Sequence, residues 1–339
     1  MGKITIFGAG ITGLSTAFIL SQNNPSHAIT IVARDLPGDD PSQNWASPWA
    51  CAGWVALGGT PLEQEMQLTA LTFLRRLALD HPESSVRCVE LTDIFPDGVK
   101  ANDTSPGGVW FSGRVPDFEV IHDGSDGEGA KVKYGSAVLT PGVFLPWLKA
   151  RLEERGVKFV RVAEVKALGE LTCLGHDVLV NASGLASLTL LDVWDESVVM
   201  DRTYVCVVKS EYPFAHVKRG AGIYTYAFGR GDGTAALGGV SDSPVEEVKP
   251  TWTVRTDIMS RMHATLPSHF PSSEASYYKY VEDLVGIRPM RLAGVRTEKQ
   301  DINGQKVVHA YGTTIGGYIH SFGLAQVVAR LVEESLSMV

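Results

Sequence analysis

The alternation of apolar and polar positions predicts a parallel sheet at the start of the chain. Residues 3–8 (KITIFG) and 28–35 (AITIVARD) are short apolar runs typical of buried strands. Between them, residues 8–22 (GAGITGLSTAFILSQ) combine a glycine turn with an amphipathic helical pattern. A strand, glycine turn, helix and strand in this order predict the βαβ unit that opens many dinucleotide-binding folds.

The rest of the chain predicts further helices and a second sheet. Residues 62–80, 141–156 and 251–267 have apolar residues at helical spacing, and the second of these segments ends in a glycine, as many helices do. The polar, glycine-rich residues 123–131 predict an exposed loop, and the segment from residue 306 predicts a strand, a glycine loop and a long helix. Strand-like patterns recur in residues 86–135, 157–162, 176–184, 203–210, 222–228 and 234–240.

These elements predict an α/β protein with a Rossmann-type domain and a second domain built on a mixed or antiparallel sheet. The nucleotide-binding elements occur at both ends and in the middle of the chain, so the division must be discontinuous. We expect the cofactor domain to contain residues 1–50, 141–190 and 286–339, and the substrate domain to contain residues 51–140 and 191–285.

Composition excludes several classes of protein. The 339 residues carry a formal net charge of −8, which argues against nucleic-acid binding because that function requires a basic face. No run of about 18 apolar residues predicts a membrane span. The four cysteines form no CxxC pair, which indicates reduced thiols in an intracellular protein with no metal site. The chain enters a strand at once, unlike a signal peptide, and its end, SLSMV, lacks a peroxisomal address.

The glycines of FGAGITGL have the spacing of a dinucleotide-binding motif. Gly8 would form the tight turn, Gly10 would let a pyrophosphate approach the backbone, and Gly13 would allow close packing of helix and strand. The following helix N-terminus adds N–H groups and a partial positive charge. Asp35, 22 residues after Gly13, suits the hydroxyls of a ribose. Its neighbour Arg34 is either an adenine contact or a solvated strand end.

Two other segments favour FAD over NAD. Gly316 and Gly317 precede the last helix, whose N-terminus could face the pyrimidine part of a flavin and stabilise charge on the reduced ring. Residues 180–187 (VNASGLAS) provide a second turn of small residues after a strand, where bulky side chains would obstruct a cofactor.

With these motifs in place, the sequence resembles the D-amino-acid oxidase family along most of its length. The opening ITIFGAGITGLSTA, the loop ASPWACAGW (46–54) and the pair ERGVKF and DVLVNASGLAS are similar to its flavin-binding segments. YTYAF resembles the family's tyrosine-bearing strand, VGIRPMRLAGVRTE its arginine segment, and VVHAYGTTIGGYIHSFG its C-terminal signature. In the loop at residues 46–54, Cys51 stands where fungal relatives have glycine, and Gly53 stands where they have asparagine.

The resemblance implies a non-covalently bound FAD and a D-amino acid that is oxidised at Cα by hydride transfer to flavin N5. The imino acid would hydrolyse to a 2-oxo acid and ammonia, and dioxygen would be reduced to hydrogen peroxide. It also implies a peroxisomal protein, otherwise a cytoplasmic one, and a possible homodimer. The residues that would contact FAD are Gly8, Ala9, Gly10, Ile11, Thr12, Gly13, Arg34, Asp35, Ala46, Ser47, Cys51, Ala52, Gly53, Val165, Ser183, Gly184, Arg288, Thr314, Gly316, Gly317, Tyr318 and Ile319.

The resemblance also implies roles at the substrate. Arg288 would clamp the α-carboxylate through two parallel hydrogen bonds, and Tyr226 would donate its hydroxyl to the same carboxylate. The alternatives are a structural salt bridge for Arg288 and a half-buried strand tyrosine for Tyr226. Carbonyl groups near Gly316 could receive the amino group, and Tyr224 would form part of the pocket wall.

Substrate preference stays open between neutral and acidic D-amino acids. Arg219 lies seven residues before Tyr226, on the expected loop and at the spacing of an arginine in mammalian D-aspartate oxidases. There it would pair with a second substrate carboxylate, because an unpaired buried charge is costly. A neutral substrate would instead leave Arg219 unpaired unless its side chain swings to solvent. A glycine or sarcosine oxidase is a more distant alternative, and a non-catalytic flavoprotein and an NAD-dependent dehydrogenase are the remaining ones.

Overall fold

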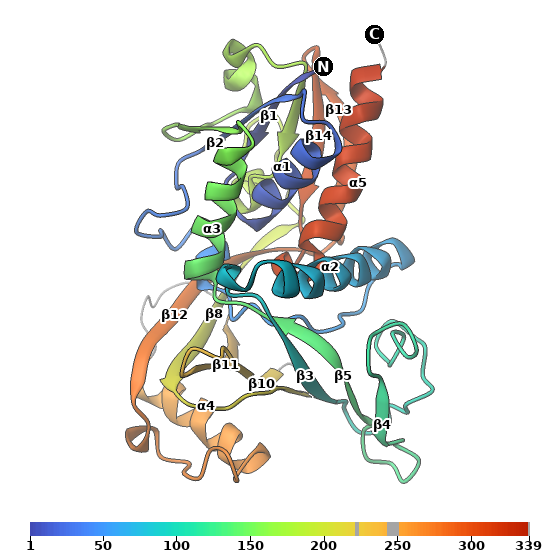
Figure 1. The fold of residues 1–339 in the computed structure, drawn as a ribbon, viewed down its shortest axis with the longest axis vertical. Coiled ribbons are helices and arrows are strands. Elements are labelled where there is room, and N and C mark those ends of the chain that lie inside the picture. The colour runs from blue at the N-terminus through green and yellow to red at the C-terminus, as the bar shows by residue number, and fades with distance from the viewer. Residues whose placement is uncertain (221–223, 243–250, 338–339) are drawn as a thin grey trace.

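The computed structural model describes residues 1–220, 224–242 and 251–337, and these residues form two β-sheets with helices around them (Figure 1). The first sheet contains six strands, in the order β13 (Arg296–Ile302), β14 (Gln305–Tyr311), β7 (Val178–Asn181), β1 (Lys3–Phe7), β2 (Ala28–Ala33) and β6 (Lys158–Arg161). Except for the antiparallel β13–β14 pair, neighbouring strands in it are parallel.

The predicted βαβ unit is present. β1 and β2 pair in parallel from Lys3↔Ala28 to Phe7↔Val32, and α1 (Ile11–Asn23) connects them. Most residues of both strands are buried, because helices cover the sheet. On one side, α5 (Gly317–Ser337) packs against α1.

The second sheet is mostly antiparallel, apart from the parallel pair of β3 and β9. It contains eight strands, in the order β12 (Tyr280–Arg291), β8 (Val198–Lys209), β11 (Thr234–Asp242), β10 (Tyr224–Gly229), β9 (Ala215–Arg219), β3 (Arg87–Ile94), β5 (Lys131–Val138) and β4 (Glu119–His122). Together the two sheets confirm the α/β fold class predicted from the sequence.

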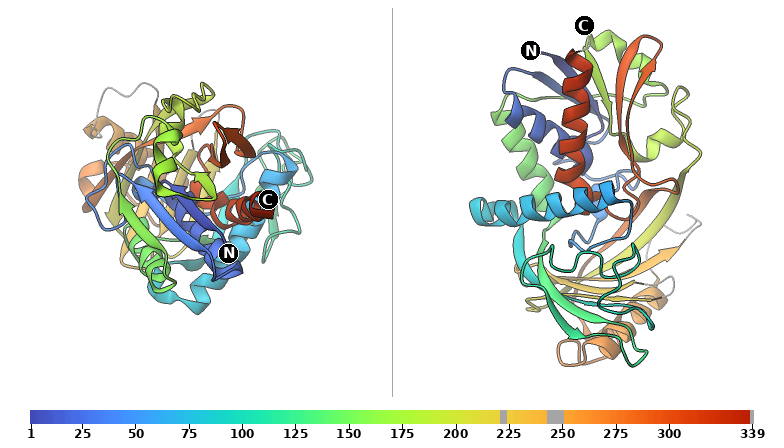
Figure 2. Two further views of the ribbon diagram at one scale, coloured as in Figure 1. Left: turned by 90° about the horizontal axis from the view of Figure 1, so that it is seen from above. Right: turned by 90° about the vertical axis from the view of Figure 1, so that its right-hand side faces the viewer.

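The remaining helices are placed around and between the sheets. α2 (Pro61–Asp80) crosses between them and packs against α5, as Figure 2 shows, while α4 (Trp252–Thr265) covers the outer face of the second sheet. α3 (Pro141–Glu154) packs against α1. The short 3-10 helices are η1 (Ser47–Trp49), η2 (Pro82–Ser84), η3 (Leu168–Leu174), η4 (Gly184–Leu188) and η5 (Ala275–Tyr277).

Two sequence expectations about the second sheet need correction. The segment before the tyrosine strand is not simply a loop, because Ala215–Arg219 forms β9 and pairs with β10 and β3. β10 starts at Tyr224, and residues 222 and 223 of the expected strand lie outside the described residues. In addition, β12 continues to Arg291, so the second sheet extends beyond the domain boundary placed at residue 286. We keep the two-domain division as a proposal and move that boundary to about residue 292.

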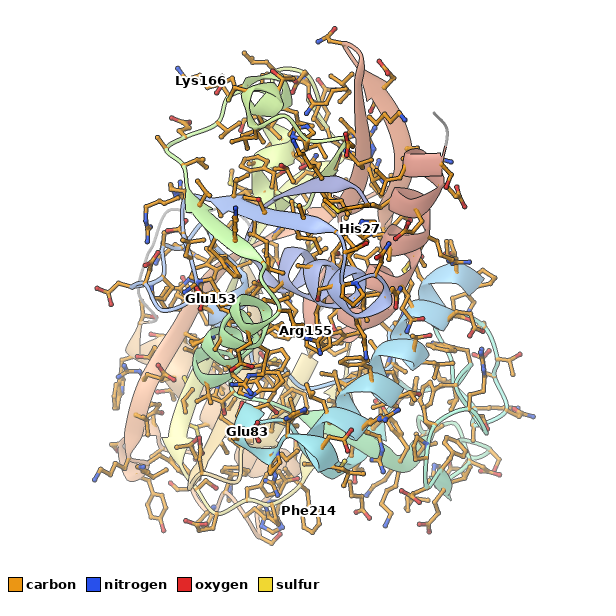
Figure 3. All side chains as sticks on the ribbon, turned by 45° about the horizontal axis from the view of Figure 1, so that its top comes forward. His27, Glu83, Glu153, Arg155, Lys166 and Phe214 are labelled. Carbon is orange, nitrogen blue, oxygen red and sulfur yellow. The ribbon has the colours of Figure 1, made fainter. Side chains whose placement is uncertain are left out.

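A buried histidine joins the N-terminal part of the chain to α5. The ring of His27, just before β2, lies next to α5 (Figure 3), and its Nε2 is 2.6 Å from Glu333 Oε1. Its Nδ1 accepts a hydrogen bond from the backbone N–H of Gly2.

Across the described part of the chain, no helix is both long and apolar enough to span a membrane.

Candidate active site

A cavity of about 710 Å³ extends between the two sheets. One part lies at the carboxyl ends of the parallel strands β1 and β2, where ligands bind in open α/β sheets. The other part reaches strands β10 and β12 of the second sheet. The loop that contains η1 and the segment before α5 also contribute to its wall.

The glycine turn between β1 and α1 has room for backbone and no room for side chains. Gly8 has φ +118°, and a Cβ added to it would lie 2.3 Å from the carbonyl oxygen of Ala182. A Cβ on Gly13 would lie 1.9 Å from the oxygen of Gly8. Gly13 therefore serves the packing of helix on strand, and it is not among the residues that line the cavity. Gly10 is the N-cap residue of α1, and it has no side chain to accept a hydrogen bond from the first turn of this helix.

The acidic and basic residues at the end of β2 pair with each other. Nη2 of Arg34 donates to Asp35 Oδ2 at 2.8 Å and to the hydroxyl of Ser42 at 3.0 Å. Both charged side chains line the cavity. The position of Asp35 fits the predicted ribose contact, while Arg34 is held by its neighbour.

Of the sequence-predicted cofactor residues, all but Gly13 and Gly316 line the cavity. A Cβ on Gly316 would lie 2.7 Å from Nδ1 of His320. The glycine therefore makes room for a side chain of α5 and not for a ligand in the cavity. Ser47 accepts a hydrogen bond from the N–H of Ile11 (2.9 Å), which ties the η1 loop to the start of α1. The hydroxyl of Tyr318 donates to the carbonyl of Ser47 (2.9 Å) and ties the same loop to α5.

Arg288 lines the cavity from β12 and has a carboxylate partner within the protein. Its Nε donates to Oδ2 of Asp201 at 2.9 Å, and Nη2 contacts the same oxygen. Asp201 faces Arg288 across the β12–β8 pair and is buried. The salt-bridge alternative is thus present in the structure, and the guanidinium also borders the cavity.

Tyr226 lies beside this arginine. Its ring covers the backbone of Gly238 and Gly239, where an added Cβ would come within 2.4 Å and 2.8 Å of ring atoms. Burial, and next the neighbouring Cys51, raise the pKa of Tyr226 well above its ordinary value, although the charge of Arg288 opposes them. The phenol is therefore neutral at any physiological pH and can act as a hydrogen-bond donor.

Arg219 does not line the cavity, contrary to the arrangement that an acidic substrate would need. It ends β9, and its Nε and Nη2 donate to Asp93 at 2.8 and 2.6 Å. A third hydrogen bond connects Nη2 with the carbonyl of Ala56 (2.7 Å), and the guanidinium lies 4.3 Å from the ring centroid of Phe95. The expectation that Arg219 would be unpaired, or turned to solvent, without an acidic substrate is wrong, because the buried Asp93 is its partner.

Sequence reasoning missed much of the apolar wall. Tyr224 lines the cavity, as predicted, from the exposed start of β10. Other apolar side chains that line the cavity come from β8, β9, β10 and β11 and from residues 55, 57 and 315. These residues are Val55, Leu57, Met200, Val217, Phe228, Val240 and Ile315.

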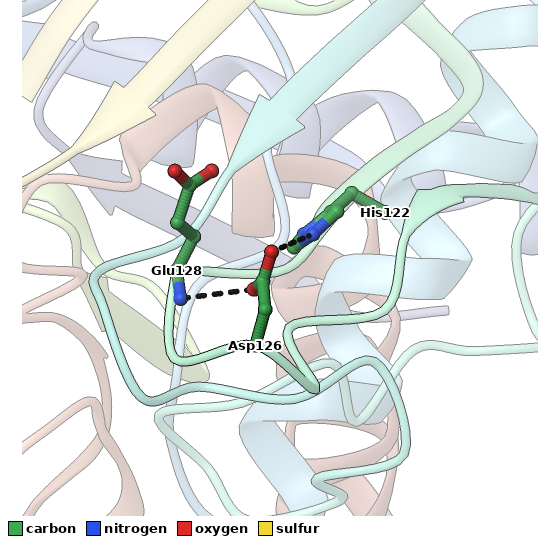
Figure 4. A group of neighbouring side chains, drawn as sticks. All are labelled: His122, Asp126 and Glu128. Carbon is green, nitrogen blue, oxygen red and sulfur yellow. Dashed lines mark hydrogen bonds and ion pairs between the residues drawn. The ribbon is translucent and has the colours of Figure 1, made fainter.

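A group of potential metal ligands lies on the loop between β4 and β5 and not at the cavity. Ligand atoms of His122, Asp126 and Glu128 lie within 4.8 Å of one another (Figure 4). Hydrogen bonds within the loop account for this arrangement, since His122 contacts Asp126 at 3.0 Å and the N–H of Glu128 donates to Asp126 at 3.1 Å. The bond to Asp126 raises the pKa of His122.

The residues of the cavity fit a flavin dinucleotide. The side-chain-free glycine turn and the start of α1 form a cradle for a pyrophosphate. The indole N–H of Trp45, at the same turn, is buried without a hydrogen-bond partner among the described residues. At the other end, the N-terminal turn of α5 borders the cavity.

Comparisons with known proteins agree with this geometry. The sequence model of the FAD dependent oxidoreductase family matches residues 3–331. A D-amino-acid oxidase from Fusarium vanettenii is 29% identical, covering 98% of this chain and 96% of its own length. A D-aspartate oxidase from Talaromyces thermophilus is also 29% identical, with 97% and 95% covered.

Among solved structures, glycine oxidase from Geobacillus kaustophilus superposes with a TM-score of 0.76 at 16% identity, covering 98% of this chain and 95% of its own. This likeness shows the fold. The family match spans nearly the whole chain and confirms the cofactor that the motifs predicted. The chain belongs to the FAD dependent oxidoreductase family.

Proposed function

We propose that the protein is a D-amino-acid oxidase that acts on neutral, apolar substrates. The observation that carries this proposal is the composition of one end of the cavity, where Arg288 and Tyr226 border a wall of apolar side chains. Relatives of similar length are named D-amino-acid oxidase and D-aspartate oxidase, which supports the reaction class.

Arg288 binds the substrate α-carboxylate, because a planar guanidinium matches a carboxylate in geometry and in charge. Tyr226 donates a hydrogen bond to the same group from its neutral phenol. These two contacts fix the carboxylate, so the Cα–H bond has one orientation in the cavity.

Bound FAD supplies the acceptor for the two electrons that leave the substrate Cα. The protein residues contribute position and a low-dielectric surrounding. Val55, Leu57 and Phe228 restrict water near the substrate. The imino acid product then hydrolyses in water to a 2-oxo acid and ammonia.

An apolar substrate side chain suits the cavity better than a second carboxylate. The described cavity-lining residues include two arginines, Arg34 and Arg288, and each contacts a carboxylate of the protein. Arg219 is held by Asp93. A second substrate carboxylate would therefore lose its hydration without gaining a cation, which is unfavourable.

A preference for acidic substrates is the second candidate. The D-aspartate oxidase among the relatives and the seven-residue spacing of Arg219 and Tyr226 favour it. In this case Arg219 would have to leave Asp93 and the carbonyl of Ala56 when substrate binds. That movement would leave a buried carboxylate without its cation.

Anaerobic reduction of the bound flavin by single amino acids tests these candidates. D-Alanine and D-valine are expected to bleach the visible absorbance of the bound flavin much faster than D-aspartate does. Faster reduction by D-aspartate would establish the acidic preference. Reduction by glycine or sarcosine but not by D-alanine would overturn the proposal altogether.

Three further features rest on the resemblance and belong to this proposal: dioxygen as the electron acceptor, assembly as a homodimer, and a peroxisomal location. Hydrogen peroxide formed in step with the 2-oxo acid tests the first. Sedimentation of the holoenzyme tests the second. Microscopy of a fluorescent fusion tests the third.

A further inference from the structure

One donor at the cavity has no hydrogen-bond partner among the residues that the structure describes. The indole Nε1 of Trp45 is buried and makes no hydrogen bond to any described residue. The side chain lines the cavity, and its ring packs against the main apolar core. A buried N–H without an acceptor is costly, so the site calls for an acceptor that occupies the cavity.

Trp45 differs in this respect from most of the other tryptophans of the chain. Five of them donate their indole N–H to an oxygen of the protein, namely Trp49 to Ser42, Trp54 to Gln67, Trp110 to Leu57, Trp147 to Glu83 and Trp194 to Glu196, at 2.9–3.1 Å. Oxygen atoms of the protein thus accept hydrogen bonds from these five indole groups. For Trp45, we infer that a ligand provides the acceptor.

The position of Trp45 identifies the ligand group. A Cβ added to Gly10 would lie 3.7 Å from Trp45 Nε1 and 3.0 Å from Ser47 Oγ, so both side chains close over the turn at the start of α1. Ser47 already accepts from the N–H of Ile11. The acceptor at this turn is one that also faces the positive end of a helix, which favours an anionic oxygen.

We propose that the indole N–H of Trp45 donates a hydrogen bond to the pyrophosphate of FAD. Other residues, Asp35 and Arg34 just after β2, would contact the adenosine part of FAD. Trp45 thus adds a side-chain donor to the backbone donors of the glycine turn. This role depends on the FAD site and not on which amino acid is oxidised.

Titration of the apoprotein with FAD tests the proposal without using activity. Trp45→Phe keeps an aromatic ring and removes the N–H, and it is expected to raise the dissociation constant of FAD about tenfold, as for one hydrogen bond to a charged group. Trp194→Phe is the control, because Trp194 is exposed and its N–H already has an acceptor in Glu196. The control should bind FAD like the native apoprotein.

A spectroscopic measurement locates the bond. The native protein labelled with ¹⁵N-tryptophan should show seven indole N–H signals, one for each tryptophan. Addition of FAD is expected to move the Trp45 signal downfield, and Trp45→Phe should shift a ³¹P signal of the bound pyrophosphate. The other six signals can be assigned from their own Trp→Phe variants, so the result does not depend on the folding of Trp45→Phe.

Two outcomes overturn the proposal. The first is an FAD dissociation constant for folded Trp45→Phe that is within threefold of the native value. The second is a Trp45 indole signal that stays in place when FAD is added to the native apoprotein.

Discussion

At the scale of single residues, Arg219 shows that a matching spacing does not by itself establish a contact with the substrate. It has the spacing that an acidic-substrate site would need, but it lies in a buried ion pair with Asp93, which also accepts from the hydroxyl of Tyr134. Burial disfavours the charge of Arg219, yet the Asp93 carboxylate outweighs it and the pKa of Arg219 is raised. The bond from Arg219 to the Ala56 carbonyl holds the backbone between the cavity residues Val55 and Leu57.

Arg219→Met is therefore expected to affect stability more than selectivity. It leaves Asp93 buried without its cation, which should lower the free energy of unfolding by about 3 kcal/mol. The ratio of kcat/KM for D-aspartate to that for D-alanine should stay within about threefold of the native ratio. Urea unfolding and steady-state kinetics measure the two quantities.

The neighbouring Lys218→Met is the matched control, because it removes the same charge from an exposed position of the same strand. Its stability should change little. A selective loss of D-aspartate turnover in Arg219→Met alone would show that the arginine contacts the substrate.

At the scale of elements, the start of α2 illustrates a local signal with a tertiary consequence. Thr60 Oγ1 accepts from the N–H of Glu63, and the Glu63 carboxylate accepts from the N–H of Thr60, which forms a capping box. The same carboxylate accepts from the N–H of Val295 (2.9 Å), just before β13. The cap thus also connects α2, which lies between the sheets, to the first sheet.

Thr60→Ala is expected to lower the free energy of unfolding by about 1 kcal/mol, because an N-cap acceptor is lost. Thr72→Ala provides a control in the same helix, since the exposed Thr72 only contacts the carbonyl of Leu68 one turn earlier. This control should be neutral or slightly stabilising, as alanine favours helix. Urea unfolding of both variants measures the difference, and equal effects would contradict the capping role.

At the scale of the whole molecule, each sheet contains a buried neutral histidine. His309 on β14 lies between Asn181 (3.1 Å) and Gln300 (2.8 Å), and His216 lies on β9. Burial, followed by neighbouring positive charge, lowers the pKa of each to about 4. The unfolded chain has histidines with a pKa of about 6.5 and so binds more protons below that pH.

The free energy of unfolding is therefore expected to be highest above about pH 6.5 and to fall as the pH drops towards 4, by up to roughly 3 kcal/mol for each histidine. Urea unfolding at pH 7 and pH 4.5 measures this fall. His309→Gln should make it smaller, whereas His269→Gln at an exposed position should not. A pH dependence that is equal in both variants would contradict the role of His309.

The sequence determined the local features of this protein. Gly8 and Gly13 specify their turn because a side chain there would meet backbone atoms, and a side chain at Gly10 would meet Ser47. Periodicity specified α1 and α2 to within a residue or two of their ends. The FAD site followed from this turn together with residues 180–187 and the glycines before the last helix, because those two segments favoured FAD over NAD.

Only the tertiary structure decided which residues meet across the sheets. Asp93 and Arg219 lie 126 positions apart, and Asp201 and Arg288 lie 87 apart, so no local pattern records these pairs. The indole N–H of Trp45 has no acceptor among the described residues, and the sequence could not show this because it depends on the surroundings of the side chain. Burial and charge pairing depend on the packed chain, and for this reason they settled the place of Arg219 where spacing could not.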